Sequence, residues 1–560
     1  MTAAAAREVP QWLSRGVALH QQGRLPEAQA LYRQILREDP GHFDALHLSG
    51  LIAHQNGDAA AAVELIRRAL VINPHEASAH CNLGSVLQQL GRLPEAVASF
   101  DRAIGIRPDF AEAYFNRGIA LQALRRWEDA LRSYDRAIGI RPDFAAAHCN
   151  RGFVLDKLHR WDGALSSFDR AIALDPGMTR AWLNRCALLR DLGATERALE
   201  SADRWIGIAP SDPCAHIARG NALTQLREWS LGGASYDRAI ELSPGCGEAH
   251  FCKSLALLQQ GDFEKGWPEH EWRWKNLNGP NVKDPRHFKQ PLWLGELSVE
   301  GKSILLYGEQ GFGDVLQFCR YASLVAERGG RVLLEVREPL CRLMQSLAGP
   351  ACVLRRGDPL PDFDYHCPLM SLPLAFGTRI DTVPAQRRYL AAEANKVEQW
   401  QTWLDKTTRP RVGLVWSSGS AMPGGHRRDI PLAELVRYLP EGYEYVSLQK
   451  EVRASDRELL HAQTPILDFA ERLHDFSDTA ALCECMDLVI SVDTGLAHLA
   501  GALGAPTWVV LPHHPDWRWL LDREDSPWYP TMRLFRQGPT GVWGGVLQQI
   551  TVAIKTLHAV

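Results

Sequence analysis

The sequence has no run of 18 uninterrupted apolar residues, which is about the length that a membrane-spanning helix needs. Its N-terminus, MTAAAAREVPQWLSRG, lacks the basic start and apolar core of a secretion signal. The 12 cysteines are scattered without the paired spacing of a disulfide framework or a zinc cluster. A net charge of -4 gives no general attraction to nucleic acid or to an anionic membrane. We therefore expect a cytoplasmic chain with reduced thiols, no membrane span, no nucleic-acid partner and no bound metal.

The size and composition set only broad limits. A chain of 560 residues is too long for one hydrophobic core, and its length predicts about three or more domains. A hydrophobic fraction of 46% with 23% charged residues is ordinary for a soluble protein. The class of function has to come from the order of the residues.

A 34-residue repeat runs through the first half of the chain. Proline marks it seven times, at Pro40, Pro74, Pro108, Pro142, Pro176, Pro210 and Pro244. Glycine keeps the same register at Gly16, Gly50, Gly84, Gly118, Gly152 and Gly220. Small residues let two helices approach closely, and proline ends the second helix. The pattern closely resembles the tetratricopeptide repeat over residues 9–276, which implies an all-α superhelix whose groove binds proteins. We expect its tryptophan-rich last unit to dock the repeats onto the region that follows.

Polar residues recur at the same interval. One position of the repeat carries Asn82, Asn116, Asn150 and Asn184. An amide both donates and accepts hydrogen bonds, so a row of them suits an extended acceptor peptide. A similar ladder lines the superhelix of the eukaryotic O-GlcNAc transferases, which also join such repeats to a glycosyltransferase. The alternative is that asparagine is simply common at this position.

Two charged positions follow the same period. Arginine occupies one at Arg117, Arg151, Arg185 and Arg219, and aspartate occupies another at Asp101, Asp135, Asp169 and Asp237. Repeated charge of both signs usually supports a fold. We interpret these residues as structural ion pairs between adjacent helices.

The second half alternates strand and helix patterns. Buried strands are predicted at 303–308, 331–336, 411–416, 443–449, 487–493 and 506–512. A strand, a glycine turn, a helix and a further strand form a βαβ unit, and two such series predict two Rossmann-like domains with a ligand cleft between them. We place a connector at 277–299, an acceptor-side domain at 300–395, a donor-binding domain at 410–535 and a C-terminal helix at 536–560.

Two glycine turns in this half carry a family resemblance. The stretch SVDTGLAHLAGALGAP, residues 491–506, resembles the donor-site signature of glycosyltransferase family 9, the ADP-heptose lipopolysaccharide heptosyltransferases. The turn GFGDVL, residues 311–316, resembles that family's N-terminal glycine-aspartate turn. The resemblance covers roughly residues 300–560 and implies a two-domain GT-B fold. It also implies transfer from a nucleotide sugar with inversion, without a required metal or cofactor.

The turn DTG fits a diphosphate on physical grounds as well. A helix start leaves backbone N–H groups unpaired, so Thr494, Gly495 and Leu496 are predicted to cradle the phosphates. The resemblance assigns Asp493 and His498 to the donor site. In the alternative, Asp493 is only a helix cap and His498 a packed helix residue.

A second donor element is SSGSAMPGGHRRD, residues 417–429. Its serines suit phosphate binding, its glycines let the loop close, and an arginine would neutralise the leaving diphosphate. The family has a lysine near this point, where the present chain offers arginines. The nucleoside is expected at the end of the strand in YVSLQK. The donor-binding candidates of these two segments are Ser417, Ser418, Arg427, Arg428, Gln449 and Lys450.

The acceptor side needs a general base, because inversion requires one carboxylate to take the proton of the attacking hydroxyl. Asp314 begins a predicted helix and matches the family's proposed base, with Glu309 as the reserve candidate. A helix cap is the alternative role of Asp314. The DFD at 362–364 imitates a metal-binding motif but follows no convincing nucleotide strand, so we interpret it as a loop. Trp517 and Trp519 suit either stacking on a ligand or packing.

The sequence therefore predicts a glycosyltransferase that moves a sugar from a nucleoside-diphosphate sugar to a hydroxyl, on a protein held by the repeats. One alternative is an enzyme directed at a glycan or lipopolysaccharide. Another is a peptide-binding scaffold whose transferase half is inactive. The sugar, the nucleobase and the oligomeric state are not encoded in these motifs.

Overall fold

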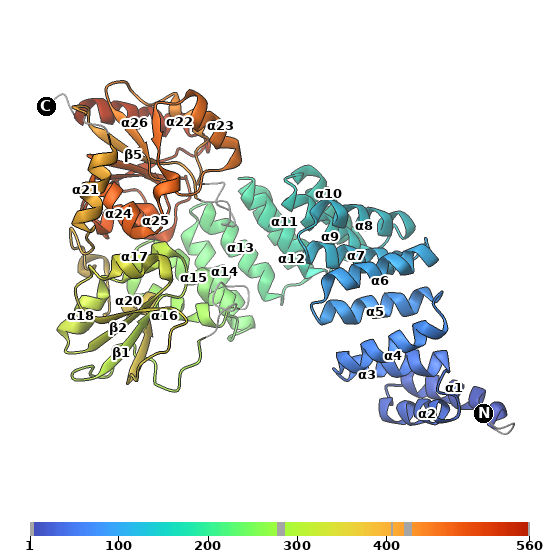
Figure 1. The fold of residues 1–560 in the computed structure, drawn as a ribbon. Helices are drawn as coiled ribbons and strands as arrows, with labels where there is room; N and C mark the ends of the chain where they lie inside the picture. Colours follow the sequence, from blue (N-terminus) through green and yellow to red (C-terminus); the bar gives the residue numbers. More distant parts are fainter. Residues whose placement is uncertain (1–4, 277–285, 405–406, 419–427, 558–560) are drawn as a thin grey trace. The chain divides into compact units, whose positions relative to one another are not determined.

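The structure is a computed structural model that describes residues 5–276, 286–404, 407–418 and 428–557. The chain forms two compact units, Met1–Ala222 and Leu223–Val560, and the division falls within one helix, α13 (Pro213–Gln225) (Figure 1). No helix in the described ranges is long and apolar enough to cross a membrane.

The first unit consists of antiparallel helix pairs. Its helices are α1 (Ala5–Gln21), α2 (Leu25–Glu38), α3 (Phe43–Gln55), α4 (Ala59–Ile72), α5 (Ala77–Gln89), α6 (Leu93–Ile106), α7 (Ala111–Ala123), α8 (Trp127–Ile140), α9 (Ala145–Lys157), α10 (Trp161–Leu174), α11 (Thr179–Asp191) and α12 (Thr195–Ile208). The second helix of each pair ends shortly before a periodic proline, as the sequence predicts.

The periodic glycines mark the places where the two helices of a pair meet. A Cβ atom on Gly84 would lie 2.6 Å from the ring of Phe100, and one on Gly118 would lie 2.6 Å from the ring of Tyr134. Both rings are fully buried. A larger residue at either glycine would push the helices apart, which explains the 34-residue spacing physically.

The repeated charges form the predicted ion pairs. Arg117 binds Asp101 at 2.6 Å, and Arg151 binds Asp135 at 2.7 Å, in each case between neighbouring helices. The same pairing joins Arg185 to Asp169 at 2.7 Å, Arg219 to Asp203 at 2.8 Å, and Lys253 to Asp237 at 2.7 Å. The structural interpretation of these residues is confirmed.

The second unit begins with further repeat helices and continues with two parallel sheets. The helices are α14 (Trp229–Leu242), α15 (Gly247–Gln259), α16 (Phe263–His270) and the 3-10 turn η1 (Glu271–Trp274). The first sheet has the order β3-β2-β1-β4, with β1 (Ser303–Tyr307), β2 (Arg331–Val336), β3 (Pro350–Arg355) and β4 (Tyr365–Pro368). Its helices are α17 (Phe312–Phe318), α18 (Tyr321–Glu327), α19 (Glu338–Met344) and α20 (Leu372–Ala375), with the turn η3 (Leu369–Ser371).

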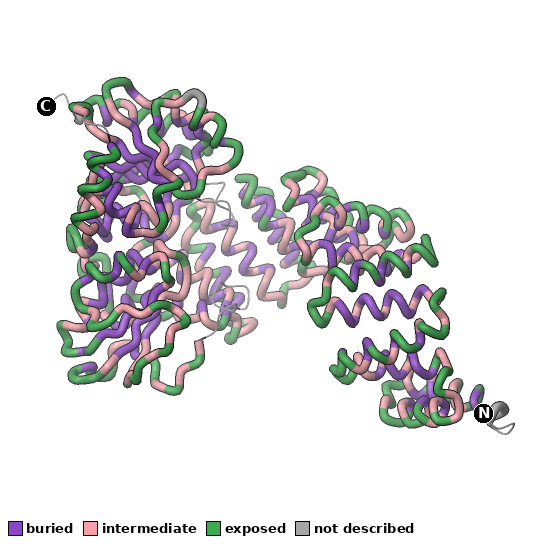
Figure 2. Tube along the Cα trace, viewed as in Figure 1, coloured by how far each residue is buried: buried purple, intermediate pink, exposed green. Residues whose placement is uncertain are grey.

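The second sheet has the order β10-β9-β8-β5-β6-β7. Its strands are β5 (Arg411–Val415), β6 (Glu444–Ser447), β7 (Ile466–Asp468), β8 (Leu488–Val492), β9 (Thr507–Leu511) and β10 (Met532–Arg536). Its principal helices are α21 (Ala394–Trp403), α22 (Leu432–Val436), α23 (Ala454–Gln463), α24 (Phe476–Glu484), α25 (Gly495–Ala502) and α26 (Gly544–Leu557), with the turn η7 (Trp517–Trp519). β8 and β9 are buried along their whole length, as expected for central strands of a parallel sheet, and Figure 2 shows buried segments gathered around the place of β5 in Figure 1. The predicted order of an all-α repeat region followed by an α/β region is confirmed.

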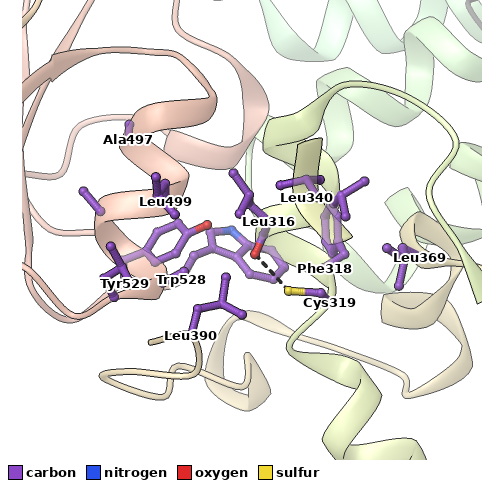
Figure 3. Packing of buried hydrophobic residues seen from close by; sticks show 14 of the residues in the cluster. Leu316, Phe318, Cys319, Leu340, Leu369, Leu390, Ala497, Leu499, Trp528 and Tyr529 are labelled. Carbon is purple, nitrogen blue, oxygen red and sulfur yellow. Dashed lines mark hydrogen bonds between the residues drawn. The ribbon is translucent and has the colours of Figure 1, made fainter. Parts of the chain in front are cut away.

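One hydrophobic core joins the last repeat helices of the second unit to both sheets. Leu316 and Phe318 of α17 belong to this core together with Leu499 and Trp528 (Figure 3), and the rings of Phe318 and Trp528 are 5.7 Å apart between centres. The ring of Trp267 on α16 packs 5.3 Å from Trp517 and 6.5 Å from Phe318, measured between ring centres. The tryptophan-rich last repeat therefore docks onto the α/β region, as the sequence predicts.

Candidate active site

The two glycine turns occupy equivalent places in their sheets. The GFGD turn follows β1 and opens α17, whereas the DTG turn follows β8 and opens α25. Both lie at the carboxyl ends of parallel strands, where α/β sheets receive ligands. Thr494 caps α25, because its hydroxyl oxygen accepts the N–H of Leu496 at 3.3 Å.

The two turns are in contact with each other. A Cβ atom on Gly313 would lie 2.9 Å from Cδ2 of His498 and 3.4 Å from Cα of Gly495. A Cβ atom on Gly495 would lie 3.4 Å from the backbone N of Gly313. A side chain at position 313 would collide with the His498 ring, and the contact brings the starts of α17 and α25 together. Partial positive charge from two helix starts therefore gathers at one place.

Asp314, the predicted base, is held from both sides. One of its oxygens accepts the backbone N–H of Gly311 at 2.7 Å, and the other accepts from the Arg518 guanidinium. Arg518 is buried and also donates to Gln317 at 2.7 Å and to Asp516 at 2.9 Å. Each carboxylate oxygen keeps a second lone pair, so Asp314 is fixed in orientation and still able to accept a proton.

Arg428 and Asp493 meet beside these turns. Arg428 donates to the backbone carbonyl and to the carboxylate of Asp493, both at 3.3 Å. Burial raises the pKa of Asp493 to about 6, and the negative charge of Asp516 adds to the rise, while Arg428 opposes it. An arginine that is already near the turn and only partly buried is placed to meet a further anion.

His498 is a packed and neutral residue of α25. Its ring stacks on Trp519 at 5.4 Å between centres, and Nδ1 is 2.9 Å from the Tyr529 hydroxyl. Burial lowers the pKa of His498 to about 3, and the positive charge of Arg518 adds to the fall. The imidazole therefore shapes the wall behind Gly313 instead of contributing charge. Trp517 and Trp519 are themselves buried, in agreement with packing.

Three predicted donor residues are tied into the fold of the second sheet. Gln449 accepts the backbone N–H of Trp416 at 2.7 Å and of Ser417 at 2.9 Å, and it donates to the Ser417 hydroxyl at 2.9 Å. The Ser418 hydroxyl donates to Asp429 at 2.9 Å. Gln449, Ser417 and Ser418 are all buried. In this structure they organise the end of β5.

The remaining donor and base candidates are dispersed. Lys450 donates to the backbone carbonyl of His474 at 2.5 Å, and Arg427 lies outside the described residues. The side chain of Glu309 is buried against Arg273, which binds both of its oxygens at 2.8 and 2.9 Å. Glu309 is thus close to the GFGD turn in sequence but faces the last repeat.

The asparagine ladder contacts the neighbouring repeat. Asn82 lies 3.0 Å from the His47 ring nitrogen, and Asn116 donates to the Cys81 sulfur at 3.9 Å, each 35 residues earlier in the chain. Asn150 is buried, whereas Asn184 is half-buried. Part of the hydrogen-bonding capacity of the ladder therefore links successive repeats.

Other features lie away from the two turns. Asp364 of the DFD sequence accepts the backbone N–H of Ser303 at 2.8 Å at the start of β1, so it supports the sheet edge. A cavity of about 600 Å³ is bounded by β10 and α26 and is lined by residues including Arg533, Phe535 and Val552. It contains none of the predicted site residues.

Sequence reasoning missed Arg518 and Asp516. Both lie in HHPDWRW, the segment after β9, where only the tryptophans drew attention. A signal was present, because the loop that follows the carboxyl end of a central parallel strand lies at the ligand edge of a sheet, and this loop carries both charged residues. Their partner Asp314 is 204 residues away, and that pairing is not readable from spacing.

Comparison with known families agrees with this arrangement. Tetratricopeptide repeats match residues 2–42, 13–77, 81–145, 149–213 and 217–266. Glycosyltransferase family 9 (heptosyltransferase) matches residues 450–515, which include β7, β8, β9 and the DTG turn. The predicted combination of repeats with a family 9 region is confirmed, and the second match supports a glycosyltransferase activity in general. Gly313 and Asp314 lie outside the matched residues.

Individual relatives cover parts of the chain. Protein FlbA of Caulobacter vibrioides is 27% identical over 322 residues, and the chain spans about half the length of this curated relative, 53%. The crystal structure of MamA is 24% identical in sequence. The match covers 29% of this chain and 94% of the MamA chain, with a TM-score of 0.28. PilF of Pseudomonas aeruginosa is 17% identical. The match covers 37% of this chain and 94% of the PilF chain, with a TM-score of 0.34. YrrB, described as a tetratricopeptide-repeat protein with an unusual peptide-binding site, is 22% identical, covering 34% and 100%, with a TM-score of 0.30.

Proposed function

We propose that the protein is a GT-B type glycosyltransferase that moves a sugar from a nucleoside-diphosphate sugar to a hydroxyl group, with inversion at the anomeric carbon. The observation that carries the proposal is the contact between Gly313 and Gly495, which joins the Asp314 turn to the DTG turn of the family 9 region. An acceptor base and a diphosphate-binding helix start are thereby available to one substrate pair.

Asp314 is the proposed general base. It takes the proton of the acceptor hydroxyl while the oxygen of that hydroxyl attacks the anomeric carbon. The new bond joins the anomeric carbon to the acceptor oxygen, and the bond from that carbon to the diphosphate breaks. The hold of Arg518 and of the Gly311 N–H on the carboxylate fixes the direction of the transfer. Attack from the face opposite the diphosphate inverts the centre.

The leaving diphosphate is proposed to lie at the start of α25. The backbone N–H of Gly495 and the helix dipole face it, and Arg428 is near enough to contribute positive charge through its contact with Asp493. These groups stabilise the charge that develops on the departing oxygen. They support a reaction that needs no metal or other cofactor.

The acceptor is proposed to be a protein held by the repeats. Tetratricopeptide repeats bind proteins in general, and the asparagine ladder adds amides suited to a peptide backbone. Turnover on a free glycan, unchanged by alanine substitution of Asn82, Asn116, Asn150 and Asn184, would instead identify a glycan-directed enzyme.

The test of the proposed activity is turnover of a donor. The purified chain is incubated with ADP-, UDP-, GDP- and CDP-sugars, and release of nucleoside diphosphate is followed for the wild type and for Asp314→Asn. The proposal predicts hydrolysis or transfer with one donor, reduced about 10² to 10⁴-fold in the variant. Equal rates in the two proteins would overturn the role of Asp314, and no turnover with any donor would favour the scaffold alternative.

A further inference from the structure

Arg273 is a buried cation at the end of the last repeat. Only 1% of its side chain is exposed, and it lies in η1, directly after α16. Its Nε and one terminal nitrogen bind the two oxygens of Glu309 at 2.9 and 2.8 Å. It also donates to Glu271 at 2.6 Å, to the Ser371 hydroxyl at 2.7 Å and to the backbone carbonyl of His270 at 3.2 Å. Arg273 thus links the repeat helices to Glu309, which lies two residues after the end of β1.

Glu309 belongs to the GEQGFGD turn, which continues into α17 and Asp314. Its side chain is 3% exposed. Burial raises the pKa of Glu309, while Arg273 opposes that rise. A bidentate ion pair, such as the one between Arg273 and Glu309 that we call the fork, fixes both distance and angle. The start of the turn therefore has a defined position relative to η1.

The same repeat helices also hold the other flank of the site. Gln259 of α15 donates to the backbone carbonyl of Pro515 at 3.1 Å. The rings of Trp267 and His270 pack on Trp517. Pro515 and Trp517 belong to the segment that carries Arg518, the partner of Asp314. The last repeat therefore contacts both the turn that carries Asp314 and the segment that carries its partner Arg518.

We infer that Arg273 is a positioning residue for the transferase, and that the last repeat is a working part of the active site as well as a connection to the repeats. The inference rests on the proposed function. Arg273 acts through Glu309 to hold the GEQGFGD turn where Asp314 meets the acceptor hydroxyl. Loss of the fork would leave the fold intact but displace the turn.

The fork is suited to a decisive test because of its charges. Removal of Arg273 alone takes away the guanidinium that binds both oxygens of the buried Glu309 carboxylate, and loss of one member of a buried ion pair destabilises a protein strongly. Removal of both by residues of similar size is often neutral for stability. The double variant Arg273→Met/Glu309→Met therefore separates stability from positioning, whereas either single variant does not.

The experiment uses the full chain. Melting temperature, kcat and KM for the donor are measured for the wild type, the two single variants and the double variant. The double variant Arg411→Met/Glu444→Met is the matched control, because it removes an ion pair between the first residues of β5 and β6, at the amino ends of both strands and away from the ligand edge. The inference predicts that the double variant regains the melting temperature lost by Arg273→Met, while kcat stays roughly 100-fold low, the size expected for a displacement of about 1 Å. KM for the donor should change little in the Arg273→Met/Glu309→Met variant. The control variant should keep the kcat and KM of the wild type.

Hydrogen exchange of residues 308–316 supplies a readout that needs no donor. The inference predicts faster exchange in this segment for the Arg273→Met/Glu309→Met variant and not for the control. Recovery of both melting temperature and kcat would overturn it, since the fork would then serve stability alone. Unchanged exchange in 308–316 would overturn it too. If the wild type turns over no donor, the proposed function fails, and the exchange result still decides whether Arg273 positions the turn.

Discussion

Gly313 and Gly495 meet backbone to backbone, and a Cβ atom on Gly495 would lie 3.4 Å from the backbone N of Gly313. Each lies in the first turn of a helix, and the two helices follow strands of different sheets. The family 9 match reaches Gly495 but not Gly313. The contact therefore joins the DTG turn, which lies in the family 9 match, to the GFGD turn, which lies outside it.

Alanine at position 313 should separate the two turns. The added methyl group would lie 2.9 Å from the His498 ring, which is backed by Trp519 and Tyr529 and has little room to retreat. We expect Gly313→Ala to lower kcat/KM for the donor roughly 100-fold, with a small loss of stability. Gly545→Ala is the control, because a Cβ there meets nothing within 4 Å. Equal activity of the two variants would show that the contact is not required.

Arg518 and Asp314 should behave as one unit. Arg518→Met leaves Asp314 without the partner that orients it, so both Arg518→Met and Asp314→Asn should lower kcat by about 10² or more. Because each substitution removes the same function, the double variant should be little worse than Asp314→Asn alone. Arg533→Met, which removes an exposed arginine, should retain full kcat. Multiplicative losses in the double variant would indicate independent roles.

His498 should make the protein sensitive to acid. Its pKa is about 3 in the folded protein, against an ordinary value of 6.5. Between these values the unfolded chain binds a proton that the folded protein excludes, so the free energy of unfolding falls as the pH falls from 6.5 toward 3. The share of the free energy of unfolding that depends on a neutral His498 is fully present above pH 6.5 and is lost as the pH falls.

The matched variant for this effect is His498→Asn, which keeps a polar group near Tyr529 and cannot titrate. Urea unfolding of both proteins at pH 7 and pH 4 isolates the histidine, because the other titrating groups are shared. The stability difference between wild type and variant should shift by about 3 kcal/mol against the wild type at pH 4. A difference that does not change with pH would mean that His498 is protonated in the fold.

The ion pairs of the repeats should matter little and only for stability. Arg151 and Asp135 are partly exposed, at 32% and 47% of their side chains. Exposed pairs contribute about 0.2 to 1 kcal/mol, so a double-mutant cycle of Arg151→Met and Asp135→Asn should give a coupling free energy in that range. Donor turnover should be unchanged. A coupling of several kcal/mol, or a loss of turnover, would contradict a purely structural role.

The fold was largely predictable because its signals are local and repeated. The 34-residue period arises from contacts such as Gly84 with Phe100, only 16 residues apart, and the strands are short apolar runs beside glycine turns. The turns of Asp314 and Gly495 were recognisable for the same reason. Periodicity and motif spacing record neighbours along the chain.

The rest of the site depends on contacts between distant segments. Arg518 reaches Asp314 across 204 residues, and Arg273 reaches Glu309 across 36. No spacing rule links these pairs. Gln449 shows the converse, because a polar residue at a strand end suits a ligand in sequence terms but is used in the structure to fix the backbone of Trp416 and Ser417.

The most direct test of the account is nucleotide binding at the DTG turn. Thermal melting of the wild type and of Gly495→Trp is followed with ADP, UDP, GDP and CDP, and Gly545→Trp serves as the control for a bulky residue elsewhere. We expect one nucleotide to raise the melting temperature of the wild type and of the control, because binding at 100 times Kd adds about 2.7 kcal/mol to the free energy of unfolding. The same nucleotide should have no effect on folded Gly495→Trp. No stabilisation of the wild type by any of the four, or equal stabilisation of Gly495→Trp, would contradict it.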